Sequence, residues 1–281
     1  MTISSYEITD VYGNVFLCNH NDEYDTDDSS HIRYRIDIGS TRINPPCLTI
    51  IVIHQGEEYR VHVEGLYADV DCAEENDLVS GRKGTQSMLL CGLQMAKWLY
   101  PKVKEFELQD ESHLPENETI SLSDIYMMTR GKAWYESFLK VIPVRSDDRM
   151  TVSGFSNTMK QTMNMQYYDM MYQGLGKNKQ MADQDMEMKK IWQGCYWKCA
   201  MYEFMTYISK NKGSIYWIKN LSRLMTMLNV SSVKGILWKG YLIEQESRLK
   251  SVKEYKTMKR FGQRGGMMTR PRGLPLEEIM Q

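Results

Sequence analysis

The sequence has no apolar run long enough to cross a bilayer, which argues against one large class of proteins. The longest strongly apolar stretch runs from Leu48 to Ile53, whereas a membrane-spanning helix needs roughly 20 residues. The first residues also lack the basic region and following apolar region that make up a signal peptide. We therefore expect a protein that is neither secreted nor inserted into a membrane.

The cysteines lack the close spacing of a disulfide-rich fold. Six of them are scattered over 281 residues, and disulfide frameworks occur in smaller chains with denser cysteines. We therefore expect reduced thiols in an intracellular protein. Metal ligands are also scarce, because no histidine follows His113. Neither Cys18 with His20 nor Cys195 with Cys199 supplies the four ligands of a structural zinc ion, so we expect no metal.

An excess of one charge sign is absent from the chain as a whole. Lysine and arginine number 35 against 36 aspartate and glutamate residues, so net charge alone indicates no polyanionic partner. The charges are nevertheless uneven, because residues 248–272 contain nine basic residues and a single acid, Glu254. Such a segment binds either phosphates or an acidic protein surface. Both kinds of partner remain open for residues 248–272.

The first half of the chain shows mainly the two-residue alternation of strands. A hairpin is expected over 5–18, because its two alternating runs flank the turn-forming Tyr12-Gly13-Asn14. Further strands are expected at 31–38, 47–54, 58–66, 103–108 and 139–144, with helical turns at 121–128 and 132–138. Apolar residues at helical spacing between Met88 and Leu99 predict a longer helix, which Pro101 ends.

The second half shows helical spacing and is rich in methionine, of which the chain has 22. Helices are expected near 181–210, 215–228 and 232–260. Together the patterns predict an α+β fold: a mixed sheet with flanking helices, followed by a helical C-terminal extension. The expected divisions are an α/β domain over 1–148, a helical methionine-rich region over 149–261 and a basic flexible tail over 262–281.

A glycine-rich segment, Gly81-Arg82-Lys83-Gly84-Thr85-Gln86-Ser87, comes directly before the long helix. Glycines allow a tight turn in which successive N–H groups and the positive helix end face an anion. A phosphate or pyrophosphate is the expected ligand, although the spacing matches neither the P-loop nor the dinucleotide-binding motif. A plain turn is the alternative interpretation.

The order of these features resembles the GNAT family of acyl-CoA-dependent N-acetyltransferases: strand, strand, glycine-rich turn, helix, strand, short helix, aromatic pair, strand. Residues 81–90 are similar to the CoA pyrophosphate loop of that family and its following helix. The resemblance implies that amides of Gly84, Thr85, Gln86 and Ser87 face the pyrophosphate. Trp134-Tyr135-Glu136 is similar to the late aromatic segment, which implies that Tyr135 is the general acid toward the CoA thiolate.

Three departures from the family pattern predict a degenerate site. Gly81 stands where the family prefers glutamine or arginine, and Gln86 stands where it prefers glycine or alanine. The side chain of Gln86 would obstruct the approach of a phosphate. Phe138-Leu139 replaces the usual Gly-Phe.

A second resemblance covers residues 103–138. The segments Asp110-Glu111-Ser112, Ser121-Leu122-Ser123 and Gly131-Lys132-Ala133-Trp134-Tyr135-Glu136 are similar to proteins of nucleocytoplasmic large DNA viruses, in which threonine stands at the position of Ala133. This resemblance implies a viral origin. We therefore expect a virion-associated assembly protein without a cofactor, which binds other viral or capsid proteins in the virion or host cytoplasm. The alternative is an active N-acetyltransferase that uses acetyl-CoA.

Overall fold

The structure is a computed structural model that describes residues 3–24, 32–39, 46–66, 84–109, 113–114, 117–176, 186–195, 198–213 and 215–255. Several predictions lie outside these residues. They concern Gly81-Arg82-Lys83 at the start of the glycine-rich segment, most of the basic segment after Tyr255, and the whole of the expected tail over 262–281.

Nine strands form one large sheet in the order β11-β1-β2-β3-β4-β5-β6-β10-β9. Their bounds are β1 Ile3–Asp10, β2 Val15–Tyr24, β3 Ile32–Ile38, β4 Leu48–Gln55, β5 Glu58–Leu66, β6 Glu105–Gln109, β9 Val141–Pro143, β10 Leu237–Tyr241 and β11 Leu249–Tyr255. Strands β1 to β5 pair in antiparallel fashion, β11 pairs antiparallel to β1, and β5 and β6 are parallel. A mixed sheet with helices, as the sequence predicted, is therefore confirmed.

The chain divides into two compact units, which are described separately. The first, here called the sheet unit, comprises Met1–Gln109 and the strands that follow from Lys239. The second, here called the helical unit, is Asp110–Trp238. Each unit therefore has its own core.

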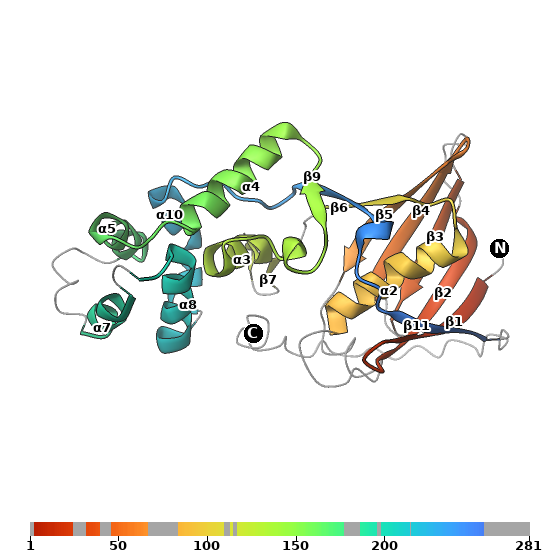
Figure 1. Ribbon diagram of the computed structural model, residues 1–281, viewed down its shortest axis with the longest axis horizontal. Coiled ribbons are helices and arrows are strands. Elements are labelled where there is room, and N and C mark those ends of the chain that lie inside the picture. The colour runs from red at the N-terminus through yellow and green to blue at the C-terminus, as the bar shows by residue number, and fades with distance from the viewer. Residues whose placement is uncertain are drawn as a thin grey trace. The chain divides into compact units, whose positions relative to one another are not determined.

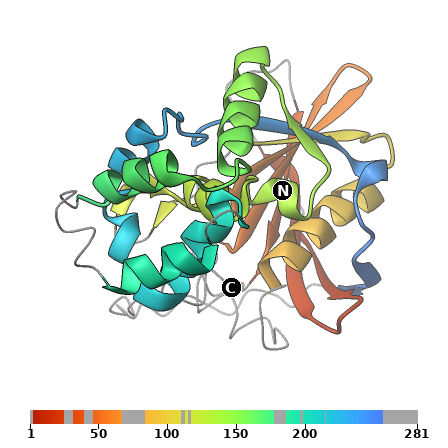
Figure 2. The same ribbon diagram turned by 60° about the vertical axis from the view of Figure 1, so that its left-hand side comes forward.

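In the sheet unit, helix α2 (Gly84–Leu99) lies across one face of the sheet (Figures 1 and 2). Alternate strand residues on that face are buried because the side chains of a strand point to opposite faces in turn; they include Ile36, Ile38, Leu48, Ile50 and Val52. Gly92 allows the close approach of α2. A Cβ atom there would lie 2.7 to 2.9 Å from side-chain atoms of Leu48, Ile38 and Ile50.

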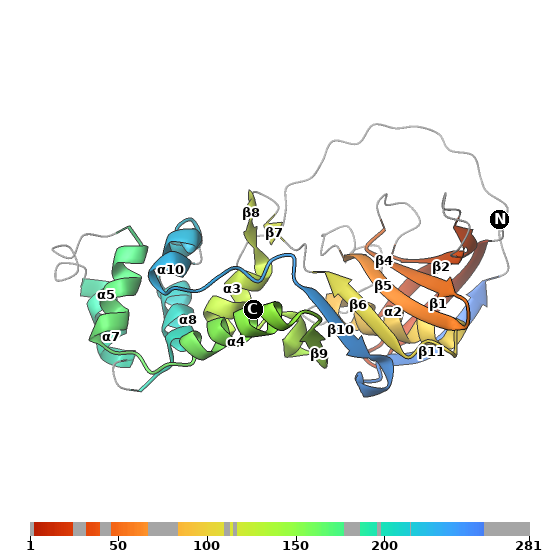
Figure 3. The ribbon, with the colours of Figure 1, turned by 90° about the horizontal axis from the view of Figure 1, so that it is seen from above.

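The helical unit consists of short elements. They are β7 His113–Leu114, β8 Asn117–Ser121, α3 Leu122–Arg130, η1 Tyr135–Ser137, α4 Ser146–Met159, α5 Met165–Gly174, α7 Met186–Cys195, α8 Met201–Lys212, α9 Ile215–Ile218 and α10 Leu221–Met227. Helix α8 packs on α3, α4 and α7, and α5 packs on α10 (Figure 3). Among the described residues, no helix has the length and hydrophobicity needed to cross a membrane.

The core of the helical unit is made largely of methionine and aromatic side chains. Eight buried methionines contribute to it: Met127, Met128, Met159, Met163, Met171, Met201, Met205 and Met225. The rings of Tyr168, Trp192 and Phe204 bring α5, α7 and α8 together, with centroids 4.7 to 6.3 Å apart. Methionine suits such a core because its flexible side chain fills irregular gaps between short helices. These methionines are therefore not available as a contact surface.

The prediction of a helix over 232–260 is wrong for the part of it that the structure describes, residues 232–255. Residues 237–255 instead form β10, the short 3₁₀ helix η2 (Leu242–Glu244) and β11, which returns to the sheet beside β1. Helices α4 to α10 therefore lie between β9 and β10 along the chain. Among the described strands β11 pairs only with β1, and edge strands carry charged side chains like those of a solvated helix. The expected 181–210 helix is divided into α7 and α8.

The expectation of reduced thiols is wrong for two of the described cysteines. Cys18 and Cys91 are free and buried, whereas Cys47 and Cys199 are disulfide-bonded. Burial, together with the charge of Asp37, raises the pKa of Cys18 to about 12. The Cys18 thiol is therefore protonated at neutral pH. Because metal binding requires a thiolate, Cys18 is a poor metal ligand in this state.

Candidate functional site

The four residues expected to face a pyrophosphate form the first turn of α2. Gly84 and Ser87 are buried, while Thr85 and Gln86 are partly exposed. Of the three side chains among these residues, that of Ser87 is therefore turned into the protein. Their surroundings decide whether this helix end can accept an anion.

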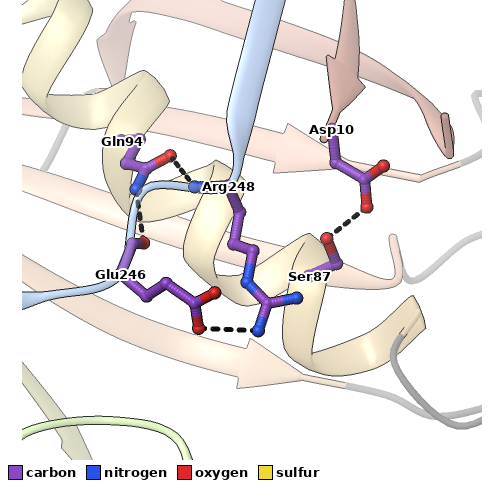
Figure 4. A network of polar contacts seen from close by, with 5 residues as sticks. All are labelled: Asp10, Ser87, Gln94, Glu246 and Arg248. Carbon is purple, nitrogen blue, oxygen red and sulfur yellow. Dashed lines mark hydrogen bonds and ion pairs between the residues drawn. The ribbon is translucent and has the colours of Figure 1, made fainter. Parts of the chain in front are cut away.

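A buried carboxylate of the same chain interacts with this helix end. The hydroxyl of Ser87 donates a hydrogen bond to Oδ2 of Asp10, at the end of β1 (Figure 4). Asp10 also accepts hydrogen bonds from the backbone N–H groups of Tyr12, at 2.9 Å, and Asn14, at 2.8 Å. The side-chain amide of Asn14 donates a fourth bond, at 2.6 Å. Asp10 therefore closes the β1–β2 turn and fastens it to α2.

A second polar contact fastens the middle of α2 to the start of β11. Oε1 of Gln94 accepts hydrogen bonds from the backbone N–H groups of Arg248, at 3.0 Å, and Leu249, at 2.6 Å. Nε2 of Gln94 donates to the backbone oxygen of Glu246, at 2.7 Å. One side chain thus fixes three backbone groups where β11 begins, and Figure 4 shows its contacts with Glu246 and Arg248.

The guanidinium of Arg248 is buried beside this contact. Its Nη2 forms an ion pair of 2.7 Å with Glu246, and its Cζ lies 4.6 Å from the ring centroid of Tyr12. Within the described structure Nε and Nη1 make no hydrogen bond. Burial and the charge of Asp10 raise the pKa of the nearby Cys91 thiol to about 12, opposed in part by Ser87 and Arg248.

These contacts make the first turn of α2 a poor anion site. The positive end of a helix favours negative charge, but the carboxylate of Asp10 already accepts the hydroxyl proton of Ser87. An added phosphate would meet that negative charge, and like charges repel more strongly in a buried setting than in water. The arrangement stabilises the fold and leaves Ser87 unavailable to a ligand.

Tyr135 belongs to the helical unit, whereas Gly84, Thr85, Gln86 and Ser87 belong to the sheet unit. Tyr135 begins the 3₁₀ helix η1 and is buried, with its ring packed edge-on against Trp134 at a centroid distance of 5.0 Å. A general acid must reach the group that it protonates. Burial of Tyr135 therefore favours a packing role.

Residues 121–136 fix the ends of α3. Ser121 is the N-cap and accepts a hydrogen bond from the backbone N–H of Asp124. Gly131 is the C-cap with a φ of 67°, a left-handed conformation that glycine adopts without strain. The carboxylate of Glu136 accepts the backbone N–H of Ala133 at 2.8 Å. These motif residues thus have clear structural roles.

A cluster of aromatic and imidazole rings, which the sequence reading did not find, lies where α2 ends. Nε2 of His20 and the hydroxyl of Tyr100 share a hydrogen bond of 2.6 Å. Tyr34 lies 4.8 Å from Tyr100, Tyr59 lies 5.9 Å from it, and His54 stacks on Tyr59 at 4.2 Å. The rings continue the apolar face of the sheet beyond the last helix residue. No group of three or more metal-ligating side chains occurs among the described residues.

Asp10, Gln94 and Arg248 were also missed by the sequence reading. A signal existed for Asp10, because aspartate before Tyr12-Gly13-Asn14 is typical of a side-chain-capped turn. No local pattern marks Gln94 or Arg248, whose contact joins positions 154 residues apart. Comparison with known proteins assigns no family: no family model, curated protein or solved structure matches this chain.

Proposed function

We propose that this chain is a virion-associated assembly protein of a large DNA virus, built on a catalytically degenerate GNAT-like scaffold. The order of β4, β5, α2, β6, α3, η1 and β9 along the chain supports the scaffold, because it follows the order of elements in that family. The parallel pairing of β5 and β6 on either side of α2 agrees with a crossover connection of this kind. The proposed partners are other viral or capsid proteins, in the virion or the host cytoplasm.

The observation that carries the proposal is the hydrogen bond from Ser87 to Asp10. It places a carboxylate of the protein against the helix turn that would hold the CoA pyrophosphate. Burial of Tyr135 supports the same conclusion, because a buried phenol packed on Trp134 is poorly placed to protonate a leaving thiolate. A GNAT-like scaffold that has neither a pyrophosphate-binding turn nor a general acid keeps its fold and provides a surface for binding other proteins.

The basic segment over 248–272 supports a role in binding. Its first residues belong to β11, which is hydrogen-bonded to β1, so the segment starts from a fixed position on the sheet unit. Lys250 and Lys253 are exposed on this strand. Their charges favour an acidic protein surface or nucleic acid, and binding of either kind weakens as salt is added.

The test is acetyl-CoA binding by the wild-type protein and two variants of one residue. Thr85→Glu adds a negative charge at the partly exposed first turn of α2, and Thr85→Gln is its neutral match. We expect millimolar acetyl-CoA to leave the melting temperature of all three unchanged. A ligand at 100 times its Kd would stabilise the protein by about 2.7 kcal/mol. A rise seen with wild type and Thr85→Gln but lost in Thr85→Glu would contradict the proposal.

The alternative function is an active acyl-CoA-dependent N-acetyltransferase, favoured by the same order of elements and by the parallel β5–β6 pair. In that case Tyr135→Phe should lower turnover by about 10²–10⁴ while stability changes little. Under the preferred proposal no acetyl transfer is measurable in either protein. Transfer from acetyl-CoA to a panel of amines, followed through release of the CoA thiol, distinguishes the two.

A further inference from the structure

A cavity of about 250 Å³ lies in the helical unit. The residues that line it come from α3, α10 and the segment after α10: Asp124, Leu221, Ser222, Met225, Thr226, Val230 and Ser232. Ser222, Thr226 and Ser232 are exposed, so the cavity opens to solvent. Its volume is large enough for a chemical group of several heavy atoms.

Asp124 provides the one carboxylate of the cavity lining. Its Oδ2 accepts a hydrogen bond of 2.6 Å from the hydroxyl of Ser232, and its Oδ1 accepts one of 2.8 Å from the backbone N–H of Val233. An ionised carboxylate accepts about four hydrogen bonds. Two acceptor positions of Asp124 therefore remain, on a side chain that is 4 % exposed and whose pKa is raised by burial and lowered by the nearby charge of Lys234.

The other lining side chains divide into hydroxyl groups and aliphatic groups. Ser222, Thr226 and Ser232 carry hydroxyls, and that of Thr226 donates to the backbone oxygen of Ser222 at 2.9 Å. Leu221, Met225 and Val230 provide an apolar wall. The cavity thus combines one negative charge, several hydrogen-bond acceptors and a hydrocarbon surface.

We propose that this cavity binds a primary ammonium group carried on a short aliphatic chain. The ammonium has three donors, which suit the Asp124 carboxylate and neighbouring hydroxyl oxygens, and its chain lies against Leu221, Met225 and Val230. A divalent metal ion would require more oxygen ligands than this one carboxylate and its neighbours supply.

The ammonium group has two possible sources, a free alkylamine and a lysine side chain of another protein. Both present the same chemistry to Asp124, so both fit the cavity. The proposal does not rest on the function proposed above, because it involves neither α2 nor Tyr135. Its outcome is therefore independent of whether the chain binds acetyl-CoA.

The experiment is a titration of the full chain, followed through the methyl resonance of Met225. The probes are n-butylammonium, Nα-acetyl-lysine methylamide and, as an uncharged control, n-butanol. We expect saturable shifts with both amines and none of comparable affinity with n-butanol. Tighter binding of the lysine derivative identifies a protein lysine as the source, and equal or weaker binding identifies a free amine.

Three variants make the result specific to the cavity. Asp124→Asn removes the charge at nearly constant size, and Thr226→Met fills the cavity without touching the hydrogen bonds of Asp124. The control Asp147→Asn removes an equal charge from the exposed first turn of α4. We expect at least tenfold weaker amine binding in the first two and unchanged binding in the control. No saturable shift with wild type, or binding that survives Thr226→Met at full affinity, would overturn the proposal.

Discussion

The two units each bury an aspartate, and they use it differently. Asp10 of the sheet unit accepts four hydrogen bonds, from Tyr12, from the backbone and side chain of Asn14, and from Ser87. Asp124 of the helical unit accepts two and lines a cavity. A carboxylate with its acceptor positions filled by the protein stabilises a fold, whereas one with positions left over can bind a ligand. Of the site residues predicted from sequence, Ser87 donates to the filled carboxylate.

The hydrophobic cores of the two units also differ in the side chains that compose them. The sheet unit packs aliphatic side chains from long paired strands against α2, and Gln94 fixes the start of β11 to that helix. The helical unit packs methionine and aromatic side chains from short helices, and a cavity lies beside α3 and α10.

The largest effect on stability is expected from shortening the chain, and two shortened chains are compared. A chain that ends at Gln245 loses β11, which leaves one edge of β1 unpaired and Gln94 without its partners Arg248 and Leu249. We expect it to lose cooperative unfolding of the sheet unit in urea, measured by circular dichroism. A chain that ends at Tyr255 keeps β11 and should unfold like the full chain, while losing most of its binding to acidic partners.

The two shortened chains also test the proposed role in assembly. If the chain that ends at Tyr255 is incorporated into particles as well as the full chain, the basic residues beyond it are not required for assembly. If the chain that ends at Gln245 has the same free energy of unfolding as the full chain, β11 contributes little to the stability of the sheet unit.

The next effect contrasts the two buried aspartates directly. Asp10→Ala leaves the donors of Tyr12, Asn14 and Ser87 without their acceptor, and each orphaned buried donor costs about 1–3 kcal/mol. We expect a loss of more than about 3 kcal/mol in the free energy of unfolding. Asp124→Ala leaves only the Ser232 and Val233 donors, beside a cavity that water can enter. Equal losses in urea denaturation would remove the distinction between the two sites.

Substitution of a helix glycine by alanine should change stability by a smaller amount, with opposite signs in the two units. In Gly92→Ala the new methyl group meets Leu48, Ile38 and Ile50 at 2.7 to 2.9 Å, so we expect a loss of about 1–3 kcal/mol from overpacking. At Gly154 in α4 a Cβ atom has nothing within 4 Å. Gly154→Ala should therefore stabilise the protein by about 0.5–1 kcal/mol through helix propensity. A Gly92→Ala protein at least as stable as wild type would show that the contact between α2 and the sheet yields easily.

The sequence predicted features that depend on nearby residues. Alternation around Tyr12-Gly13-Asn14 gave the β1–β2 hairpin, and apolar spacing with Pro101 gave α2. The sequence did not predict contacts between distant positions. Ser87 and Asp10 are hydrogen-bonded across a separation of 77 residues, and Ser232 and Asp124 across 108. The return of 237–255 to the sheet was missed because an edge strand with Lys250 and Lys253 has the composition of a solvated helix.

The smallest effect is a pH dependence that belongs to the helical unit. Burial raises the pKa of Asp124 above its usual value of 3.8, against the lowering effects of Ser232, Val233 and Lys234. A carboxyl group with a raised pKa in the folded state binds its proton more tightly there than in the unfolded chain. Its contribution is therefore fully present below the unfolded pKa and is lost as pH rises through the folded pKa.

The matched variant for this prediction is Asp124→Asn, which keeps an acceptor for Val233 but cannot titrate. The free energy of unfolding of the wild type, relative to this variant, should fall as pH rises above about 4 and level off once Asp124 is ionised in both states. Urea unfolding at a series of pH values measures the difference, and a flat difference for Asp124→Asn would mean that burial does not raise this pKa. Addition of n-butylammonium should then reduce the slope for wild type alone, because an ammonium beside Asp124 favours its charged form.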